Sequence, residues 1–546
     1  MLKDILENFN KPKNYLILGN IFLVLFLIIL NNLGVIPLRA GDLAFFAVLI
    51  LALALYRPGW AFLIFIGMIM LENINLAPEI LGLNIRPYQF IGFLIILAII
   101  IRLFTKRLNF QLAKLKFPDY LVLIITVAGF LSVAGATDRI GSLKLAVIFA
   151  SFAALYYLVR CYIQNTEDIK KIIPFFLGSS IVVVLYGIWQ NIRFIYGGAN
   201  FETMPGRSNA TFMEADWLGI FIVLVICVIY ALRYVIFNLQ FSIFNKSSIF
   251  NDQINTKYKI QNTKYILYIF LVLTFIALIL TVSRSAWLGA FAASFIFLFI
   301  ILTDLRFKNW NWKMLLKNFI FIAGAGIISL TAVYVFHLTN FQLFNRVQST
   351  GSGLQKITIS CGFPSEIHKI LKQSSTITIK NIDELKQYNC RHINLEDIEK
   401  EKTAGNIIYE IYRKDPNISI RSEIYQKSWQ QIKKHPMLGI GWGNIGQILG
   451  KDANGNYLNS SNIFLEIWLG SGIIGIISFV ILLLYVLIKA VKNYFFAQDD
   501  LQKTISLFFI ISWLGIIIAN LFNAGIFLGF FWIWLAIANI KYEHRH

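Results

Sequence analysis

The stretch that decides the fold is residues 463–488, which read IFLEIWLGSGIIGIISFVILLLYVLI. It holds one charged residue and exceeds the roughly 20 apolar residues that cross a bilayer as a helix. Similar apolar blocks recur through the 546-residue chain, which is 57% hydrophobic and 14% charged. Soluble domains carry about 25% charged residues. Because the blocks are continuous and do not alternate, they predict helices and exclude a barrel.

The chain is therefore expected to be an all-α polytopic membrane protein, since lipid admits only helices and closed barrels. We expect about 12–14 transmembrane helices, the lower number if two short blocks are re-entrant or merge. The fourteen candidate spans are residues 15–33, 42–56, 59–71, 89–104, 119–136, 142–159, 171–191, 217–236, 265–282, 286–303, 317–336, 463–488, 504–520 and 523–540.

The net charge of +20 would suggest a nucleic-acid partner in a soluble protein. Here Lys and Arg gather in alternate loops, which is the pattern of cytoplasmic loops, so no nucleic acid is expected. The opposite, short loops hold only Arg39, Arg86, Arg139, Arg193, Arg207 and Arg284. This asymmetry predicts cytoplasmic N- and C-termini and an extracytoplasmic large loop. The expected domains are a bundle at 1–336, the large loop at 337–461 and the last helices at 462–546.

The large loop has two parts. Residues 354–380 include KITISCGF and SSTITIK, whose alternation favours a few short strands. Cys361 and Cys390 could form a disulfide there, because an extracytoplasmic compartment permits one. From about Asn417 a helix is expected, and it ends at His435, which precedes a proline.

Three arginines at membrane edges are the first candidates for binding chemistry. Arg207 precedes a span, Arg284 lies in a tight turn between two spans, and Arg421 opens the polar helix. Arginine is costly at a membrane edge, and its planar fork of donors suits phosphate. Three converging arginines would bind a diphosphate and stabilise it as a leaving group. The simpler alternative is that each one caps a helix or extends its side chain to the interface.

Polar residues near these arginines have two interpretations each. Glu214 and Asp216 are either helix N-terminal charges or functional groups, which would act as a general base or orient the arginine. His435 is either a base or a polar residue before a turn. Trp442 either stacks on a sugar or belongs to the aromatic belt at the interface. The sequence contains no nucleotide-binding glycine loop, HExxH motif or Cys/His metal spacing, so neither cofactor nor metal is predicted.

At these residues the chain resembles the O-antigen ligase and polymerase family of bacterial membrane glycosyltransferases. Four motifs match in order. They are GRSNATFMEADWLG at 206–219, SRSAWLG at 283–289, Arg421-x7-Trp429 followed by HPMLGIGWGNI at 435–445, and SNIFLEIWLGSGIIG at 461–475.

The resemblance implies a GT-C-like bundle in the bacterial cytoplasmic membrane that acts in cell-surface polysaccharide synthesis. It implies metal-independent transfer of a glycan from an undecaprenyl-diphosphate carrier to a glycan, lipid or protein acceptor on the extracytoplasmic face. Arg207 and Arg284 would then bind the diphosphate, with Arg421 as a third contact.

The family's signature after the large loop is His, then Asn, Ser or Gln, nine residues, and Gly-x-x-Gly. This chain has Asn462, Gly472 and Gly475 at the matching positions but Ser461 in place of the histidine. A serine hydroxyl is a poor base without a partner. Three alternatives stay open: Glu214, Asp216, His435 or Glu466 is the base; the donor chemistry needs little base; or the chain is inactive. A flippase of lipid-linked glycan is the other functional hypothesis.

Overall fold

The computed structural model describes residues 13–82, 84–107, 112–198, 201–203, 206–244, 250–305, 310–339, 354–362, 378–379, 382–393, 398–414, 416–451 and 457–540. The chain divides into two compact units. The first unit is Met1–Val333 with Gln430–His546, and the second is Tyr334–Trp429.

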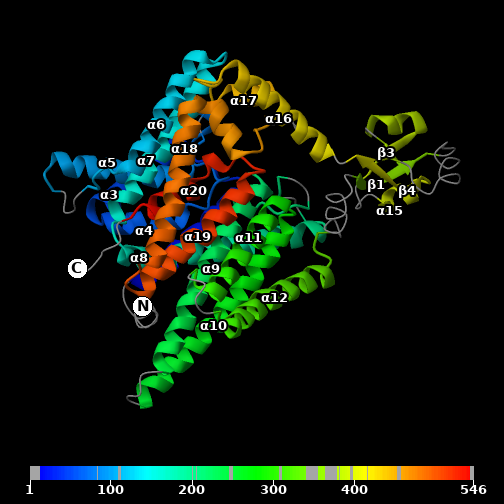
Figure 1. Ribbon diagram of the computed structural model, residues 1–546. Coiled ribbons are helices and arrows are strands. Elements are labelled where there is room, and N and C mark those ends of the chain that lie inside the picture. Colours follow the sequence, from blue (N-terminus) through cyan, green and yellow to red (C-terminus); the bar gives the residue numbers. More distant parts are fainter. Residues whose placement is uncertain are drawn as a thin grey trace. The chain divides into compact units, whose positions relative to one another are not determined.

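Each of the fourteen predicted spans corresponds to a helix of the first unit, within the described part of the chain (Figure 1). These helices are α2 (Lys13–Asn32), α3 (Ala40–Tyr56), α4 (Pro58–Met68), α5 (Pro87–Phe104), α6 (Phe117–Leu131), α7 (Arg139–Tyr162), α8 (Thr166–Ile195), α9 (Ala215–Phe244), α10 (Phe250–Leu280), α11 (Arg284–Thr303), α12 (Trp312–Val335), α18 (Ile463–Phe495), α19 (Asp500–Asn520) and α20 (Gly529–Ala538). Among the described residues, 11 helices are long and apolar enough to span a membrane, and α3, α4 and α20 are shorter. The predicted all-α polytopic membrane fold is confirmed.

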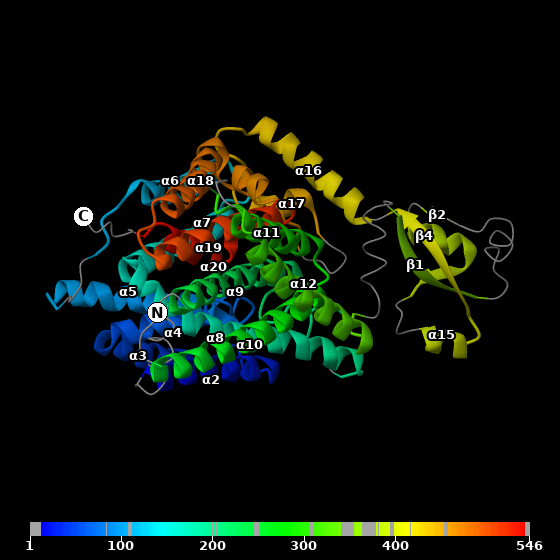
Figure 2. The same ribbon diagram turned by 60° about the horizontal axis from the view of Figure 1, so that its bottom comes forward.

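Helix α9 lies at the centre of the bundle, and 89% of its most apolar 18-residue segment is buried. It packs beside α11 and α19, and the three run side by side in both ribbon views (Figures 1 and 2). Small residues allow the close approach: a Cβ on Gly289 would lie 2.5 Å from the carbonyl oxygen of Gly515. Lipid tails are as apolar as the helices, so such close packing is what holds membrane helices together.

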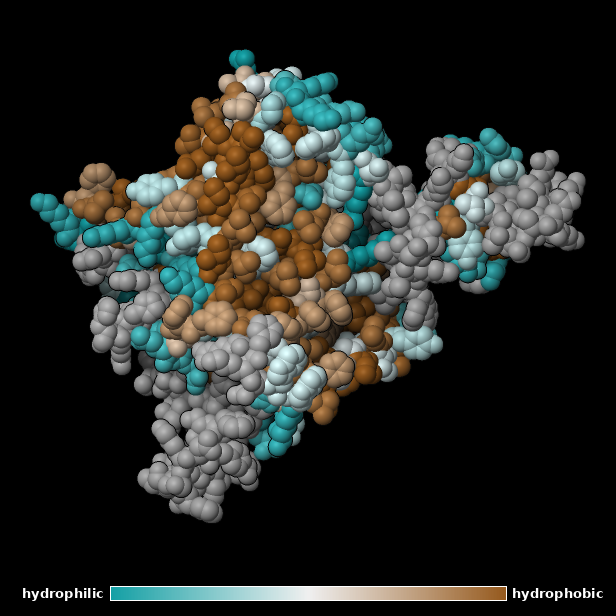
Figure 3. Space-filling model, viewed as in Figure 1, coloured by the Kyte–Doolittle hydropathy of each residue, from teal (hydrophilic) through white to brown (hydrophobic). Residues whose placement is uncertain are grey.

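Hydrophobic side chains also cover the outside of the bundle, as expected for a surface in contact with lipid. Figure 3 shows a broad hydrophobic face over α18 and α19. Ile477 and Leu484 on α18 and Phe291 and Phe295 on α11 are among the exposed large hydrophobic side chains of the bundle.

The second unit contains a small sheet. Its strands are β1 (Leu354–Cys361), β2 (Thr378–Ile379), β3 (Cys390–His392) and β4 (Ile407–Lys414), in the order β2-β4-β1-β3. Strand β1 is antiparallel to both β3 and β4, and β2 is parallel to β4. Parts of the expected strand SSTITIK, 374–377 and 380, lie outside the described residues. The predicted short strands are present at β1 and β2, and β3 and β4 are additional.

A disulfide between Cys361 and Cys390 joins β1 to the start of β3. Its half-cystines lie in the core of the second unit with Ile359, Leu385 and Ile411. This is the pairing expected from the sequence. The short helices α15 (Ile398–Thr403) and η4 (Ile382–Tyr388) complete this part of the fold, and α16 (Pro416–Lys434) begins in the second unit.

Candidate active site

Loops from distant parts of the sequence meet at one end of the bundle. The backbone N–H groups of Glu72 and Asn73 donate to the carbonyl of Thr211 at 2.9 and 2.8 Å. The N–H of Ser208 donates to the carbonyl of Leu280 at 3.1 Å. The N–H of Gly529 donates to the Glu72 carboxylate at 2.7 Å. The loop 206–214 is thereby fixed against the connections after α4, α10 and α19.

Arg207 is held by two acceptors in this end of the bundle. Its Nε donates to the carbonyl of Thr281 at 3.1 Å, and its Nη2 lies 3.3 Å from Oδ1 of Asp216. The same oxygen of Asp216 accepts the hydroxyl of Ser283 at 2.5 Å. The side chains of Arg207 and Asp216 are 12% and 24% exposed. Asp216 therefore orients Arg207, one of the two functional interpretations of this carboxylate.

The turn before Arg284 has strained backbone. Val282 has a φ of 51°, a left-handed conformation that a β-branched residue rarely adopts. Ser283 then caps α11, its hydroxyl accepting from the N–H of Ala286 at 3.5 Å. Arg284 is the first residue of this helix. A guanidinium beside the positive end of a helix dipole makes this position favourable for an anion.

The C-terminal helices join the same hydrogen-bonded cluster. Ser285, next to Arg284, accepts from Nδ2 of Asn523 at 2.8 Å. Nδ2 of Asn462 donates to the carbonyl of Leu521 at 3.0 Å. The segment after α19 thus connects the turn of Arg284 with the start of α18.

Ser461 and Asn462 occupy the junction that leads into α18. The side chain of Asn462 accepts from the N–H groups of Phe464 and Leu465 at 2.9 and 3.2 Å, so Asn462 is the helix N-cap. Ser461 precedes it with a left-handed φ of 50°. Glu466 is buried and accepts from the N–H of Ser460 at 2.8 Å. The carboxylate of Glu466 therefore fixes the backbone that presents Ser461.

Gly472 divides α18 into two pieces, 463–471 and 473–495. Its φ of 67° and ψ of −170° are not helical, and a Cβ there would lie on the backbone of Met437. The groups freed by the break bond to the segment after α16. Leu469 accepts from the N–H of Ile440 at 2.8 Å, and the N–H of Ile473 donates to Pro436 at 3.0 Å. A glycine is required here because another chain segment fills the space of its side chain.

His435 lies beside this break and not beside Ser461. The first piece of α18 separates them by about 15 Å, at 1.5 Å per residue. The side chain of His435 is exposed. His435 and Ser461 are thus at opposite ends of one short helix.

Trp442 is 2% exposed. Its ring stacks on Phe149 at a centroid distance of 5.2 Å and meets Phe527 edge-on at 5.3 Å. A sugar would have to displace Phe149 to stack on this face. The indole therefore packs inside the bundle, and neither of the two expected positions, at the interface or against a sugar, describes it.

Residues 269–480 match the family model described as O-antigen ligase. This segment of the chain is similar to the O-antigen ligase family. No curated protein matches it. The family comprises membrane enzymes that ligate or polymerise glycans, and its partners are in general lipid-linked glycans and their acceptors.

The O-antigen ligase match contains most of the predicted site residues, namely Arg284, Arg421, His435, Trp442, Ser461 and Asn462. Arg207, Glu214 and Asp216 precede it. The hydrogen bonds of Arg207 to Thr281 and of Asp216 to Ser283 nevertheless attach them to the matched segment. Glu214 is exposed, and its carbonyl accepts from N–H groups in the first turn of α9. Arg421 lies on α16 in the second unit.

Several polar residues of this candidate site are not predicted from the sequence. Ser283 and Ser285 flank Arg284 within the motif SRSAWLG, which predicts a role for the arginine alone. Glu202 is 7% exposed and accepts from the N–H of Gly206 at 2.7 Å, directly before Arg207. Burial raises the pKa of Glu202 to about 7. A carboxyl group five residues before Arg207 was the available signal.

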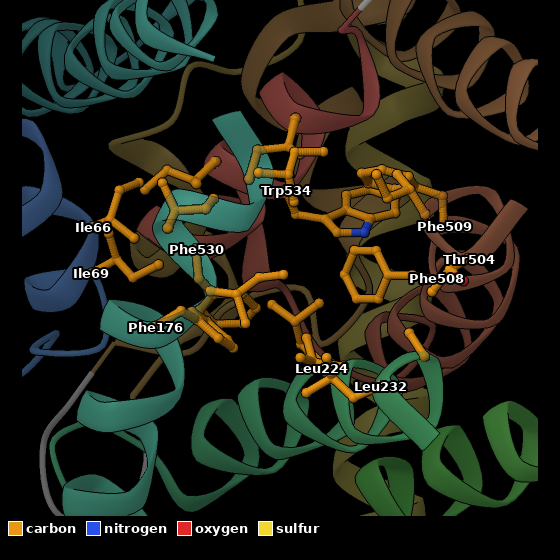
Figure 4. Close-up of a pocket in the computed structure, with 18 of the residues that line it drawn as sticks. Ile66, Ile69, Phe176, Leu224, Leu232, Thr504, Phe508, Phe509, Phe530 and Trp534 are labelled. Carbon is orange, nitrogen blue, oxygen red and sulfur yellow. The ribbon is translucent and has the colours of Figure 1, made fainter. Parts of the chain in front are cut away.

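An apolar cavity lies within the bundle among α4, α8, α9, α19 and α20, and holds about 890 Å³ of empty space. Figure 4 shows Phe176, Leu224 and Phe530 pointing into it, with Trp534 and Phe509 on another side. Phe530 also contacts Phe212, at a centroid distance of 6.1 Å. Phe212 belongs to loop 206–214, which carries Arg207 and is called the arginine loop below. Within the described residues, no group of three or more His, Cys, Asp or Glu is placed to hold a metal ion.

Proposed function

We propose that this protein transfers a glycan from a polyprenyl-diphosphate carrier to an acceptor, without a metal ion, on the extracytoplasmic face. The observation that carries the proposal is the attachment of Arg207 to the turn that presents Arg284, at the N-terminus of α11. The similarity of residues 269–480 to the O-antigen ligase family supports the class of reaction.

The proposed reaction is a single displacement at the anomeric carbon. The acceptor oxygen forms a bond to this carbon while the bond from carbon to the diphosphate oxygen breaks. The carrier diphosphate leaves with the bonding electrons, and Arg207 and Arg284 stabilise its charge. The acceptor's proton passes to a carboxylate. We assign that role to Glu214, which is exposed and lies two residues from Asp216, while Ser461 stands on the acceptor side.

The apolar cavity supports a lipid-linked donor. Its lining is hydrocarbon apart from Thr504 and the nitrogen of Trp534, so it suits an isoprenoid chain and not a headgroup. The contact between Phe212 and Phe530 places this lining directly beneath the arginine loop.

Two features support an extracytoplasmic site. Disulfides persist in oxidising compartments and are rare in the cytosol, and Cys361 and Cys390 form one. The surplus of Lys and Arg in the alternate loops gives the same orientation.

The test is release of carrier diphosphate by the purified protein in lipid nanodiscs. The donor is an undecaprenyl-diphosphate-linked glycan, offered with glycan, lipid and protein acceptors. We expect release in the wild type and a loss of about 100-fold or more in Arg284→Ala. The matched control is Arg39→Ala, which removes an exposed arginine far from this turn in sequence and should retain the rate.

Release that Arg284→Ala leaves unchanged would contradict the assigned diphosphate site. Movement of the donor across liposomes without any release would favour the flippase. Neither release nor movement, with every acceptor, would indicate an inactive member of the family.

A further inference from the structure

A second pocket lies behind the arginine loop. It is an open pocket between the end of α2, the loop after α4, α8 and the described residues near Ala210. Its space of about 450 Å³, which includes solvent at the mouth, leaves room for a single pyranose ring with its hydroxyl groups. The pocket is distinct from the apolar cavity, and no residue lines both.

The lining of this pocket is polar but uncharged. Asn31, Asn32 and Asn73 contribute amides, and Tyr186 and Thr211 contribute hydroxyl groups. The hydroxyl of Tyr186 donates to Oδ1 of Asn32 at 2.8 Å, which directs the amide N–H groups of Asn32 away from this bond. Amides offer donors and acceptors together, which is what a ligand rich in hydroxyl groups needs. An anion would have no cation among the lining residues, and an acyl chain would leave these amides without partners.

Aromatic rings form one side of the pocket. Tyr186 stacks on Trp189 at a centroid distance of 5.7 Å, and Trp189 stacks on Phe201 at 5.6 Å, both pairs within 23° of parallel. Tyr186 and Phe201 line the pocket. The C–H face of a pyranose packs on such rings, while its hydroxyl groups reach amides at the ring edge.

The pocket is close to the diphosphate site. Thr211 follows Arg207 by four residues, so their backbones are at most about 14 Å apart. The carbonyl of Thr211 accepts from the N–H of Asn73, which fixes one wall of the pocket to the arginine loop. Gln190 accepts from the N–H of Ala210 at 2.8 Å and fixes the loop from the side of α8.

We infer that this pocket binds a sugar residue of the donor's glycan, through the amides of Asn31, Asn32 and Asn73 and the rings of Tyr186 and Phe201. The inference rests on the proposed function, because it takes the donor's diphosphate to lie at Arg207 and Arg284. The pocket then selects donors by the glycan next to the carrier.

The test compares two probes, undecaprenyl diphosphate N-acetylglucosamine and undecaprenyl diphosphate alone, by their dissociation constants from the full chain in nanodiscs. We expect the wild type to bind the sugar-bearing probe more tightly. Asn73→Ala and Tyr186→Phe should each raise the dissociation constant of that probe by about three- to tenfold, which corresponds to one lost hydrogen bond. The dissociation constant of the bare carrier should not change. Tyr196→Phe is the control, since Tyr196 is 75% exposed at the end of α8.

A wild type that binds both probes equally would overturn the inference, and so would variants that weaken both probes alike. If neither carrier binds, the proposed function fails, and free N-acetylglucosamine tests the pocket by saturation-transfer NMR. A transfer signal that Asn73→Ala diminishes would then uphold the pocket as a sugar site. An absent or unaltered signal would reject it.

Discussion

Among the described residues, the bundle contains two Arg–Asp ion pairs that differ in what surrounds them. Arg160 lies 3.2 Å from Asp119, and the two side chains are 3% and 2% exposed. Asp119 also accepts the hydroxyl of Tyr156 at 2.7 Å. Arg207 and Asp216, at 3.3 Å, are 12% and 24% exposed. An arginine at a membrane edge is thus not functional by itself, because one pair is enclosed and the other remains accessible to a ligand.

The two pairs also differ in the backbone conformation of the loops near them. Ala210, Val282 and Ser461 have φ values of 45°, 51° and 50°, and all three lie in the connections around the open pair. Such conformations persist only where surrounding contacts enforce them, and they concentrate at functional sites. The strain and the accessibility of this pair both support the proposed diphosphate site.

The largest expected effect comes from breaking each pair at its aspartate. Asp119→Ala leaves Arg160 buried without its partner and should cost about 3–5 kcal/mol of folding free energy. Asp216→Ala leaves an arginine that water and ligand can reach, so stability should change little while the transfer rate falls. Thermal unfolding in detergent and carrier release measure the two quantities.

The isosteric variants Asp119→Asn and Asp216→Asn serve as controls for lost volume. Asp119→Asn should likewise lower the stability more than Asp216→Asn does, as with the two alanine variants. Equal destabilisation by Asp119→Ala and Asp216→Ala would remove the distinction between an enclosed pair and an open one.

Most of the fold could be predicted because membrane spans are a local property of the sequence. Each apolar block makes its own backbone hydrogen bonds as a helix, so its length and composition are enough to predict a span. The break at Gly472 could not be predicted in this way. Its freed backbone groups bond to Pro436 and Ile440, and no local pattern in the sequence reports such a contact.

The hydrogen-bonded cluster around Arg284 could be predicted only in part. The motif around Arg284 marked its turn, because an arginine between two spans is unusual. Asn523, which bonds to Ser285 across 238 residues, carries no comparable signal. Trp442 is an aromatic residue in a glycine-rich turn whether it binds a sugar or packs, and only its burial decides the matter.

Glu202 is a third carboxyl group near Arg207. Its pKa is set mainly by burial and not by an arginine partner. Its pKa is raised from 4.5 to about 7, so the folded protein binds this proton more tightly than the unfolded chain does. The resulting stability is present at low pH and is lost as the pH rises from about 4.5 through about 7. Glu202→Gln keeps an acceptor for Gly206 without the charge. It should therefore raise the melting temperature by a few degrees near pH 8 and change it little near pH 5.

Melting curves of the wild type and Glu202→Gln across this pH range give the measurement. A constant difference between the two proteins at all pH values would show that the carboxyl group does not titrate in this window. Glu167→Gln is the control, because Glu167 is 64% exposed and its variant should follow the wild type.

The smallest effect is expected from relieving strain beside the open pair. Ala210 has its left-handed φ of 45° because Gln190 fixes its N–H. A left-handed residue with a Cβ costs about 1–2 kcal/mol, and glycine avoids this while losing about 0.5–1 kcal/mol of chain entropy. Ala210→Gly should therefore stabilise the protein by about 0.5–1 kcal/mol, and Ala146→Gly in the interior of α7 should destabilise it by a similar amount. If Ala210→Gly also lowers the transfer rate, the strained loop positions Arg207 for binding; if the rate is unchanged, the strain follows from packing alone.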